Sequence, residues 1–317
     1  MTAFSARPYR GGEDINNLIA FATKATAARF PALTTWNPGD IVWQLGMWPA
    51  SSDFSRTVRI WDGPAGVAAL AIFEPPLNFE FDIDPSLGFE PALANEILGW
   101  AEERRRELLG AEGEVPKAYA MLGESTVSTT ALESDAQKVT FLQMNGYQRV
   151  GRHSVRYSRL LSGPLPEAHL PDGMQFKFAS EHDLEARAEL HREAWSVWGP
   201  SSFSANRYRR LRASPLYDEL LDVVVEAANG QLVSYCICWF DDANGIGHFE
   251  PVGTHPAFTA KGLGRAVVID GLHRLRERGA HTGLIGTASV NAPALRTYTA
   301  AGFEFRERQW FWSKEMP

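Results

Sequence analysis

Cysteine is scarce in this sequence of 317 residues, which contains two, Cys236 and Cys238, inside the segment "LVSYCICWF". If this segment is a strand, both side chains point to the same face, where such neighbours are poorly placed to form a disulfide. A metal site would need more ligands than this pair supplies. We therefore expect two small buried hydrophobic side chains in a reducing, cytoplasmic environment, and no bound metal.

The sequence also lacks an excess of positive charge and a long apolar run. Its formal net charge is −7, so the composition gives no support for a nucleic-acid partner. No apolar stretch is long enough to span a bilayer, and the N-terminal "MTAFSARPYR" lacks the apolar core of a secretion signal. With 44% hydrophobic residues, we expect a globular cytoplasmic protein with no membrane partner.

The length suffices for two domains of ordinary size. The segment "LSGPLPEAHLPDGM", residues 161–174, is rich in proline and glycine, which is typical of a linker. On each side of it the hydrophobic patterns predict the same order of elements. We therefore predict a tandem repeat of an α/β unit, with a degenerate first domain over 1–161, a linker over 162–173 and a second domain over 174–317.

The individual elements are predicted from periodicity and turn residues. In the first half we expect strands at 4–9, 56–61, 66–73, 78–83, 118–122 and 153–161, and helices at 14–29, at 91–109 and ending at 147. In the second half we expect strands at 174–179, 221–227, 232–240, 247–254, 282–288 and 305–313, and helices at 183–195, 265–279 and 291–303.

The segment "HPAFTAKGLGRAVVIDGLHRL", residues 255–275, places Gly262 and Gly264 at the start of a strongly patterned helix. The N–H groups at a helix start lack internal partners, and with the helix dipole they suit a phosphate. Glycine lets the phosphate approach without meeting a Cβ atom. The P-loop pattern GxxxxGK[ST] is absent, and Val267 replaces the third glycine of the dinucleotide pattern GxGxxG. Taken alone, the two glycines are equally compatible with simple turn chemistry.

The wider context, "VGTHPAFTAKGLGRAV" followed by "SVNAPALRTYTAAGF", resembles the GNAT acyltransferase superfamily. In that family a loop of pattern [QR]xxGx[GA] opens a helix, and a later helix carries N-x-x-A-x-x-x-Y before Gly-Phe. Here Thr259 replaces the first Gln or Arg of the loop, and Lys261 and Arg265 supply nearby positive charge instead. The later motif is complete, from Asn291 to Tyr298. The resemblance covers 174–317 and implies two tandem GNAT-like α/β units, each a mixed, mostly antiparallel sheet flanked by helices.

The resemblance further implies a site for acetyl-CoA. Its pyrophosphate would be held by the backbone amides of Gly262, Leu263, Gly264, Arg265 and Ala266, with Thr259 and Lys261 in the same loop. The strand edge at Val252, Gly253 and Thr254 would pair with the pantetheine arm, to which Asn291 would also hydrogen-bond. The alternative for Asn291 is a plain helix N-cap.

Acetyl transfer to an amine needs a base and an acid. Glu250 matches the strand position of the family's acidic general base, and the alternative is an ordinary carboxylate on a strand face. If the strand alternates regularly, His248, Val252 and Thr254 share its face, and His248 is the second candidate base. Pro251 and Gly253 favour a bulge at this point. Tyr298 matches the general acid that protonates the CoA sulfur, unless it is simply packed in the core, and the amide of Val252 would face the thioester oxygen.

The acceptor is expected to be a small-molecule amine that enters opposite the cofactor. The segment "HREAWSVWGPSSFSANRYRRLRASPLY" supplies four rings for such a pocket, Trp195, Trp198, Phe203 and Tyr208. The alternative, equally compatible with the pattern, is that these rings form core. The basic run Arg207–Arg212 is more typical of a solvated helix face than of a site for an acidic substrate.

The first half lacks the corresponding motifs. One glycine, Gly88, remains in "NFEFDIDPSLGFEPALANEIL", and the carboxylates Glu80, Asp82, Asp84 and Glu90 would oppose a pyrophosphate. We therefore expect an acetyl-CoA-dependent N-acetyltransferase that is catalytic in its second half, by direct transfer in a ternary complex. The alternatives are transfer of a longer acyl chain, transfer to a peptide N-terminus, and a CoA-binding sensor that has lost its chemistry.

Overall fold

A computed structural model describes residues 4–47, 53–108 and 125–317, and these form two compact α/β units. Unit 1 holds the described residues up to Asn37, those of 53–154 and Glu307–Pro317. Unit 2 holds helix α2 (Pro38–Met47) and Val155–Arg306. Both units are mixed, mostly antiparallel sheets flanked by helices, which confirms the predicted fold class.

The unit boundaries differ from the predicted 1–161 and 174–317 at two places. Helix α2 lies in the first half of the chain but packs in unit 2, because its Gly39 and Trp43 meet side chains of that unit, Trp239 and Phe203. The end of the last strand, β12 (Glu304–Glu315), pairs with a strand of unit 1. The predicted linker, residues 162–173, contains no helix or strand.

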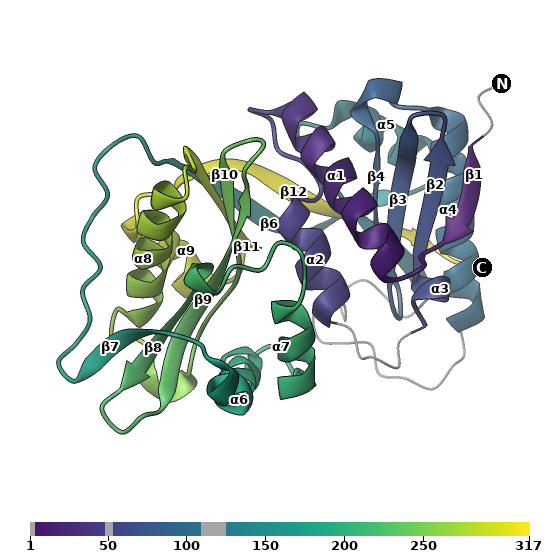
Figure 1. Cartoon of the computed structure of the whole chain (residues 1–317). Coiled ribbons are helices and arrows are strands. Elements are labelled where there is room, and N and C mark those ends of the chain that lie inside the picture. The colour runs from purple at the N-terminus through teal and green to yellow at the C-terminus, as the bar shows by residue number, and fades with distance from the viewer. Residues whose placement is uncertain (1–3, 48–52, 109–124) are drawn as a thin grey trace. The chain divides into compact units, whose positions relative to one another are not determined.

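In unit 1 the strands follow the order β1-β2-β3-β4-β5-β12 (Figure 1). They are β1 (Ser5–Pro8), β2 (Val58–Gly63), β3 (Gly66–Glu74), β4 (Asn78–Ile83), β5 (Thr126–Leu132) and the end of β12. Strands β4 and β5 are parallel, and the other neighbours are antiparallel. The strand predicted at 118–122 lies outside the described residues, and β5 was not predicted.

Helix α1 (Gly12–Arg29) packs on the sheet of unit 1 through its apolar stripe, and a short helix, α3 (Phe54–Thr57), precedes β2. Helices α4 (Pro91–Leu108) and α5 (Ala136–Met144) share one hydrophobic core with β3, β4 and β5. Between β4 and α4 lies the one-turn helix η1 (Pro85–Leu87). Strand β6 (Gln148–Leu160) then runs on from unit 1 into unit 2.

In unit 2 the strands follow the order β6-β11-β10-β9-β8-β7 (Figure 1). They are the end of β6, β11 (Thr282–Ala288), β10 (Ile246–Thr254), β9 (Leu232–Asp241), β8 (Asp222–Ala227) and β7 (Met174–Phe178). The predicted hairpin of β8 and β9 is confirmed. Strands β10 and β11 are parallel and pair over Ile246–Phe249, although both strands continue further.

Two adjacent residues of β9 show which helices cover which face of this sheet. A Cβ on Gly271 of α8 (Leu263–Glu277) would meet the Sγ of Cys238, so α8 lies on the cysteine face. A Cβ on Gly39 of α2 would meet Trp239, so α2 lies on the opposite face. Helix α9 (Ala292–Ala300) packs beside α8, whereas α6 (Leu184–Trp195) and α7 (Ala205–Arg212) pack with α2. The glycines permit both close approaches.

The two cysteines behave as predicted from the strand pattern. Cys236 and Cys238 are free and buried on one face of β9, with their sulfur atoms 3.9 Å apart. Cys236 also contacts the carbonyl oxygen of Val267 in α8. They serve as small core side chains beneath that helix.

Candidate active site

A β-bulge in β10 places Glu250 at the centre of the candidate site. Phe249 pairs with Cys238 and Val252 pairs with Cys236, so two residues of β10, Glu250 and Pro251, oppose one residue of β9. This confirms the predicted bulge. The indole N–H of Trp239 donates to the carbonyl oxygen of Glu250, at 2.6 Å, and fixes the bulge on the α2 face.

His248, Val252 and Thr254 do not share one face, because the predicted bulge breaks the regular alternation on which that expectation depended. His248 is opposite Trp239 and lies on the face covered by α2. Val252 packs with the core beneath α8, and the hydroxyl of Thr254 bonds that of Ser234, which lies on the same face as Cys236. The bulge therefore separates a face with acid–base groups from a face next to α8.

Asp40 of α2, which sequence reasoning missed, lies beside the acid–base groups. Its Oδ1 atom is 3.2 Å from the Nδ1 atom of His248, a buried ring that is 3% exposed. Burial lowers the pKa of His248, partly offset by the charge of Asp40, so the ring is neutral near pH 7. The charge of Arg156, on β6, also lowers this pKa.

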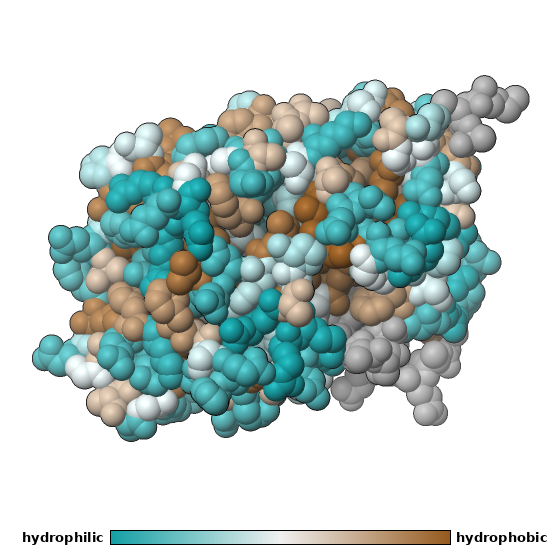
Figure 2. All heavy atoms as spheres, in the orientation of Figure 1, coloured by the Kyte–Doolittle hydropathy of each residue, from teal (hydrophilic) through white to brown (hydrophobic). Residues whose placement is uncertain are grey.

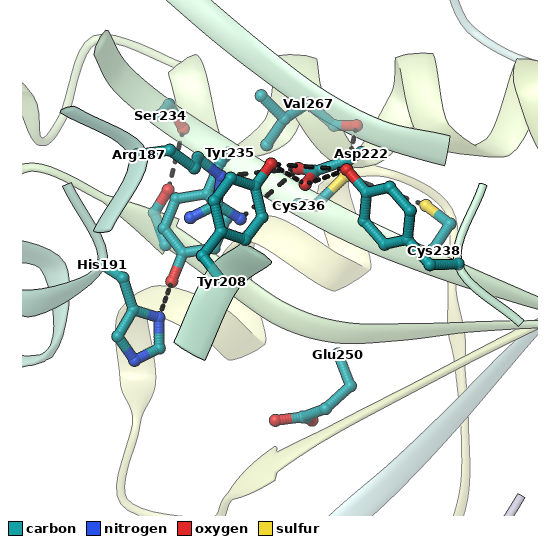
Figure 3. Close-up of polar contacts among 12 residues, drawn as sticks. Arg187, His191, Tyr208, Asp222, Ser234, Tyr235, Cys236, Cys238, Glu250 and Val267 are labelled. Atoms are coloured by element: carbon teal, nitrogen blue, oxygen red, sulfur yellow. Dashed lines mark hydrogen bonds and ion pairs between the residues drawn. The ribbon is translucent and has the colours of Figure 1, made fainter. Parts of the chain in front are cut away.

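The carboxyl group of Glu250 has a strongly perturbed pKa. Burial and the negative charge of Asp40 raise the pKa of Glu250 from 4.5 to about 8, against an opposing effect of Arg156. Among the described residues its side chain makes no hydrogen bond, in agreement with its isolated position in Figure 3. A carboxyl group with this pKa can exchange a proton near neutral pH.

Tyr298 is brought close to Glu250 from the other side of the sheet. Its side chain, on α9, is 5% exposed, and its ring lies 6.4 Å from that of Phe303. Burial, followed by the negative charge of Glu250, raises the pKa of Tyr298 well above its usual value. The phenol is therefore protonated at neutral pH and able to donate. Tyr298 also belongs to the core beneath α8. Its position is therefore compatible both with a general acid and with a packed core side chain.

The loop before α8 leaves a row of backbone N–H groups free for a ligand. Gly262 precedes the helix with φ 82°, a conformation that favours glycine, and among the described residues no side chain caps this end. The amides of Leu263, Gly264 and Arg265 come before the first amide that donates within the helix, that of Ala266, which bonds the carbonyl oxygen of Gly262. A Cβ on Gly264 would come no nearer than 3.4 Å to the protein, so the fold itself does not require glycine there. The loop thus fits a phosphate group that lies against bare backbone.

The side chains of the other loop residues are partly exposed and partly buried. Thr259 bonds the carbonyl oxygen of Pro256 with its hydroxyl, and Lys261 lies 4.9 Å from the ring of Phe258. Arg265 is exposed near the first turn of α8. By contrast, the side chains of Leu263 and Ala266 are buried in the core. The amide of Leu263 is open to a ligand, whereas the amide of Ala266 donates to the carbonyl oxygen of Gly262 at 3.0 Å, so the expectation that Ala266 holds the pyrophosphate is not met.

Asn291 and Gly253 each have a clear structural role. The Oδ1 atom of Asn291 accepts from the amide of Ala294, and its Nδ2 atom donates to Thr287, which is the N-cap alternative. A Cβ on Gly253 would lie 2.6 Å from the ring of Tyr235. Glycine at 253 is therefore needed for packing, whatever its backbone binds.

The four rings expected around the acceptor divide into two groups. Phe203 and Tyr208 are fully buried, which agrees with the core alternative. Trp198 is 39% exposed, and Trp195 is partly buried and donates from its indole N–H to the hydroxyl of Tyr235. The two tryptophans are the rings of this set that a ligand can reach.

A buried polar network fixes α6 and α7 on the sheet (Figure 3). Arg187 of α6 pairs with Asp222 of β8 at 3.4 Å, and the hydroxyl of Tyr208 donates to the same carboxylate at 2.6 Å. His191 of α6 is 2.7 Å from the hydroxyl of Tyr235, and burial lowers the pKa of His191 to about 3. Because all these groups are engaged with one another, we assign the network to positioning.

The basic run of α7 is a charged helix face, as the sequence favoured. Arg209 and Arg212 pair with Glu181, whereas Arg207 is buried and donates to the carbonyl oxygen of Met47 in α2. Figure 2 shows a mostly hydrophilic surface over α6 and α7. This surface supplies no deep site for an acidic substrate.

The fold and the site define a class of protein. In each unit a parallel strand pair lies beside antiparallel strands, and in unit 2 helix α8 has no side-chain cap at its start. Residues 184–303 match the model of the acetyltransferase (GNAT) family. The chain is thus an acyl-CoA-dependent N-acetyltransferase that uses acetyl-CoA, and its residues 184–303 are similar to a GNAT acetyltransferase domain.

Relatives and solved structures extend this likeness to both units. A mycothiol acetyltransferase of Segniliparus rotundus is 28% identical over 263 residues, which cover 78% of this chain and 91% of that protein. One of Thermobispora bispora is 31% identical over 155 residues, 47% of this chain and 52% of that protein.

Two solved structures share the fold of nearly the whole chain. A GCN5-related N-acetyltransferase from Sphaerobacter thermophilus has a TM-score of 0.65 and 19% identity, and covers 99% of this chain and 96% of its own. A tandem GNAT protein from the clavulanic acid biosynthesis pathway has a TM-score of 0.64 and 16% identity, and covers 99% and 98%. The fold of the chain is therefore similar to that of a tandem GNAT protein.

Neither a membrane-spanning helix nor a cluster of metal ligands occurs in the described part of the chain. No helix there is long and apolar enough to cross a membrane. No group of three or more His, Cys, Asp or Glu side chains there is arranged to hold a metal ion.

Proposed function

We propose that this protein transfers the acetyl group of acetyl-CoA directly to the amine of a small molecule, with both substrates bound in unit 2. The observation that carries the proposal is Glu250, a carboxyl group with a pKa of about 8 in a strand bulge beside Tyr298. Bound acetyl-CoA supplies the acetyl thioester, and the open amides before α8 hold its pyrophosphate.

The acceptor amine binds between Glu250 of β10 and Asp40 of α2, the helix that covers this face of the sheet. The negative charge of Asp40 attracts an ammonium group to this face. Glu250, directly or through a water molecule, accepts a proton so that the amine becomes nucleophilic. His248 is neutral and buried next to Asp40, which makes it the second candidate base.

The leaving thiolate requires a proton, and Tyr298 is the proposed donor. Its raised pKa keeps the phenol protonated throughout the neutral range. The backbone amide of Val252, next in the bulged strand, is the proposed donor to the thioester oxygen. No step needs a metal ion or a covalent acyl-enzyme, because base, acid and both substrates meet in one site.

The surroundings of the site favour a particular kind of amine as acceptor. Exposed Trp198 and partly buried Trp195 offer ring surface near α6, and the acidic face favours a cationic group. The similar proteins named mycothiol acetyltransferases make acceptors related to mycothiol the first to test. Polyamines, amino acids, aminoglycosides and aryl amines complete the panel.

The test follows thiol release from acetyl-CoA over this panel with three variants. Glu250→Gln should lower kcat/KM by roughly 10²–10⁴ and leave acetyl-CoA binding unchanged. Tyr298→Phe should lower kcat with little effect on KM. Glu304→Gln, which neutralises an exposed carboxylate on β12, is the matched control. If acetyl-CoA binds but neither Glu250→Gln nor Tyr298→Phe alters turnover of any acceptor, the assignment fails.

The alternatives give different results in the same assay. An enzyme for longer acyl chains would bind a longer acyl-CoA more tightly than acetyl-CoA, and one for peptide N-termini would turn over peptides from the panel. A CoA-binding sensor would bind acetyl-CoA and release no thiol with any acceptor.

A further inference from the structure

Unit 1 repeats the frame that surrounds the cofactor loop of unit 2. In both units a one-turn helix follows the parallel strand, η1 in unit 1 and η5 (Pro256–Phe258) in unit 2. Its first turn is capped by Asp84 in unit 1 and by His255 in unit 2. A glycine with positive φ follows in each, Gly88 at 64° and Gly262 at 82°. The two units therefore share the order of strand, one-turn helix, glycine and long helix, although Gly88 directly follows η1 and Gly262 directly precedes α8.

The helix start that is open in unit 2 is closed in unit 1. Helix α4 begins with Pro91, which has no N–H group, and the next amide, of Ala92, donates to the carboxylate of Glu90 at 3.4 Å. A carboxylate therefore lies at the place where α8 offers free amides for a phosphate. Its negative charge would repel a pyrophosphate.

A buried lysine lies against the strand edge that would pair with a pantetheine arm. Lys138 of α5 is 3% exposed, and its Nζ atom donates to the carbonyl oxygen of Phe81 at 2.8 Å. Phe81 precedes the capping Asp84 by three residues, as Val252 precedes His255 in unit 2. The lysine also lies three residues after the N-cap of its helix, a position taken by alanine in α9.

Arg29 closes the adjoining part of the same groove. Its guanidinium group forms two bonds of 2.7 Å with the carboxylate of Asp82 and donates to the carbonyl oxygen of Ile83. The space that remains beside Arg29, Asp82 and Lys138 is a cavity of about 260 Å³. Sites for drug-sized ligands span roughly 300–1,000 Å³, and acetyl-CoA is larger than such ligands.

We propose that unit 1 does not bind acyl-CoA, because Lys138, Arg29 and Glu90 occupy its cofactor groove, so that each chain holds one acyl-CoA, in unit 2. The inference rests on the proposed function for the location of that one site. Unit 1 then has the strand, loop and helix arrangement of a cofactor site but binds no cofactor, because the Lys138 side chain fills the groove.

The test is the binding stoichiometry of acetyl-CoA with the full chain, by isothermal titration calorimetry. We expect one site per chain, and protection from hydrogen exchange at residues 254–266. Two sites, or protection at 84–94 in addition, would overturn the inference and leave the proposed function intact. No binding, or one site protected at 84–94, would overturn the proposed function as well.

Two further variants locate the site without depending on activity. Gly264→Glu places a carboxylate at the start of α8, as Glu90 does in unit 1, and should weaken binding at least tenfold. Gly163→Glu adds the same charge at an open position and should change nothing. Binding that survives Gly264→Glu contradicts the assignment to unit 2.

Opening the groove of unit 1 tests the plug directly. The double variant Lys138→Ala/Glu90→Ala should gain a second, weaker acetyl-CoA site. Lys24→Ala, which removes a half-exposed lysine paired with Asp84, should keep one site. A folded double variant that still binds a single acetyl-CoA would show that these side chains do not close the groove, and would overturn that part of the inference.

Discussion

Glu250 should make the stability of the protein fall as the pH rises. The pKa of Glu250 is about 8 in the folded chain and 4.5 in the unperturbed state. Between these values the unfolded chain has lost the proton and the folded chain keeps it, so the free energy of unfolding decreases with pH. The contribution of the neutral carboxyl is complete below pH 4.5 and is lost by about pH 8.

The size of the effect follows from the shift of the pKa. The difference, 8 − 4.5, is 3.5 pKa units, which at about 1.4 kcal/mol per unit gives an upper limit of about 5 kcal/mol. Because part of the side chain is exposed, solvent screening reduces this to on the order of 2–4 kcal/mol. Glu250→Gln keeps the shape and cannot ionise, so it should escape this loss.

The assay is urea unfolding of the wild type and of Glu250→Gln at pH 5 and pH 9, followed by tryptophan fluorescence. The two proteins should be similarly stable at pH 5, and the variant should be more stable at pH 9 by the amount above. Glu304→Gln, an exposed carboxylate, should behave as the wild type at both pH values. A stability difference that is the same at pH 5 and pH 9 would refute the reasoning.

Four other substitutions follow from glycine packing and from charge. Gly271→Ala would place its Cβ 2.7 Å from core atoms and should lower the free energy of unfolding by roughly 1–3 kcal/mol in urea. Its control is Gly99→Ala in α4, where the Cβ has open space, and this change should raise the free energy of unfolding by about 0.5–1 kcal/mol. Gly39→Ala would meet Trp239 at 2.3 Å and displace α2, so KM for the acceptor should rise in steady-state kinetics while acetyl-CoA binding is unchanged. Asp40→Asn removes a charge that raises the pKa of Glu250, so the rise of kcat/KM with pH should move to lower pH, by on the order of one unit.

Much of the site could be predicted because its signals are local in the sequence. Gly262 has a φ of 82°, a conformation that favours glycine, so the residue type itself indicates the turn. The bulge at Glu250 is favoured by the neighbouring Pro251. The amphipathic pattern of 265–279 agrees with α8 to within two residues at each end. Features of this kind depend on a few neighbouring residues, so a single sequence contains them.

The features that were missed depend on contacts between distant segments. The segment "NPGDIVWQLGMW" carries a proline at the first position of a helix, yet nothing in it indicates that α2 packs in unit 2 and brings Asp40 to His248. Regular alternation of side chains does not hold along β10, because a bulge of one residue inverts the face of Val252 and every residue after it.

The first half of the chain contributes helix α2 to unit 2, and the absence of cofactor motifs from that half does not indicate this. Its carboxylates do not simply repel a phosphate, since Asp82 and Asp84 are paired with Arg29 and Lys24. In the proposal above, its groove is closed by Lys138, Arg29 and Glu90. Meanwhile α2, encoded between α1 and β2, places a charge that raises the pKa of Glu250. Helix α2 of the first half thus affects the proton chemistry of unit 2, whereas the proposed closure of the groove in unit 1 depends on the side chains of unit 1.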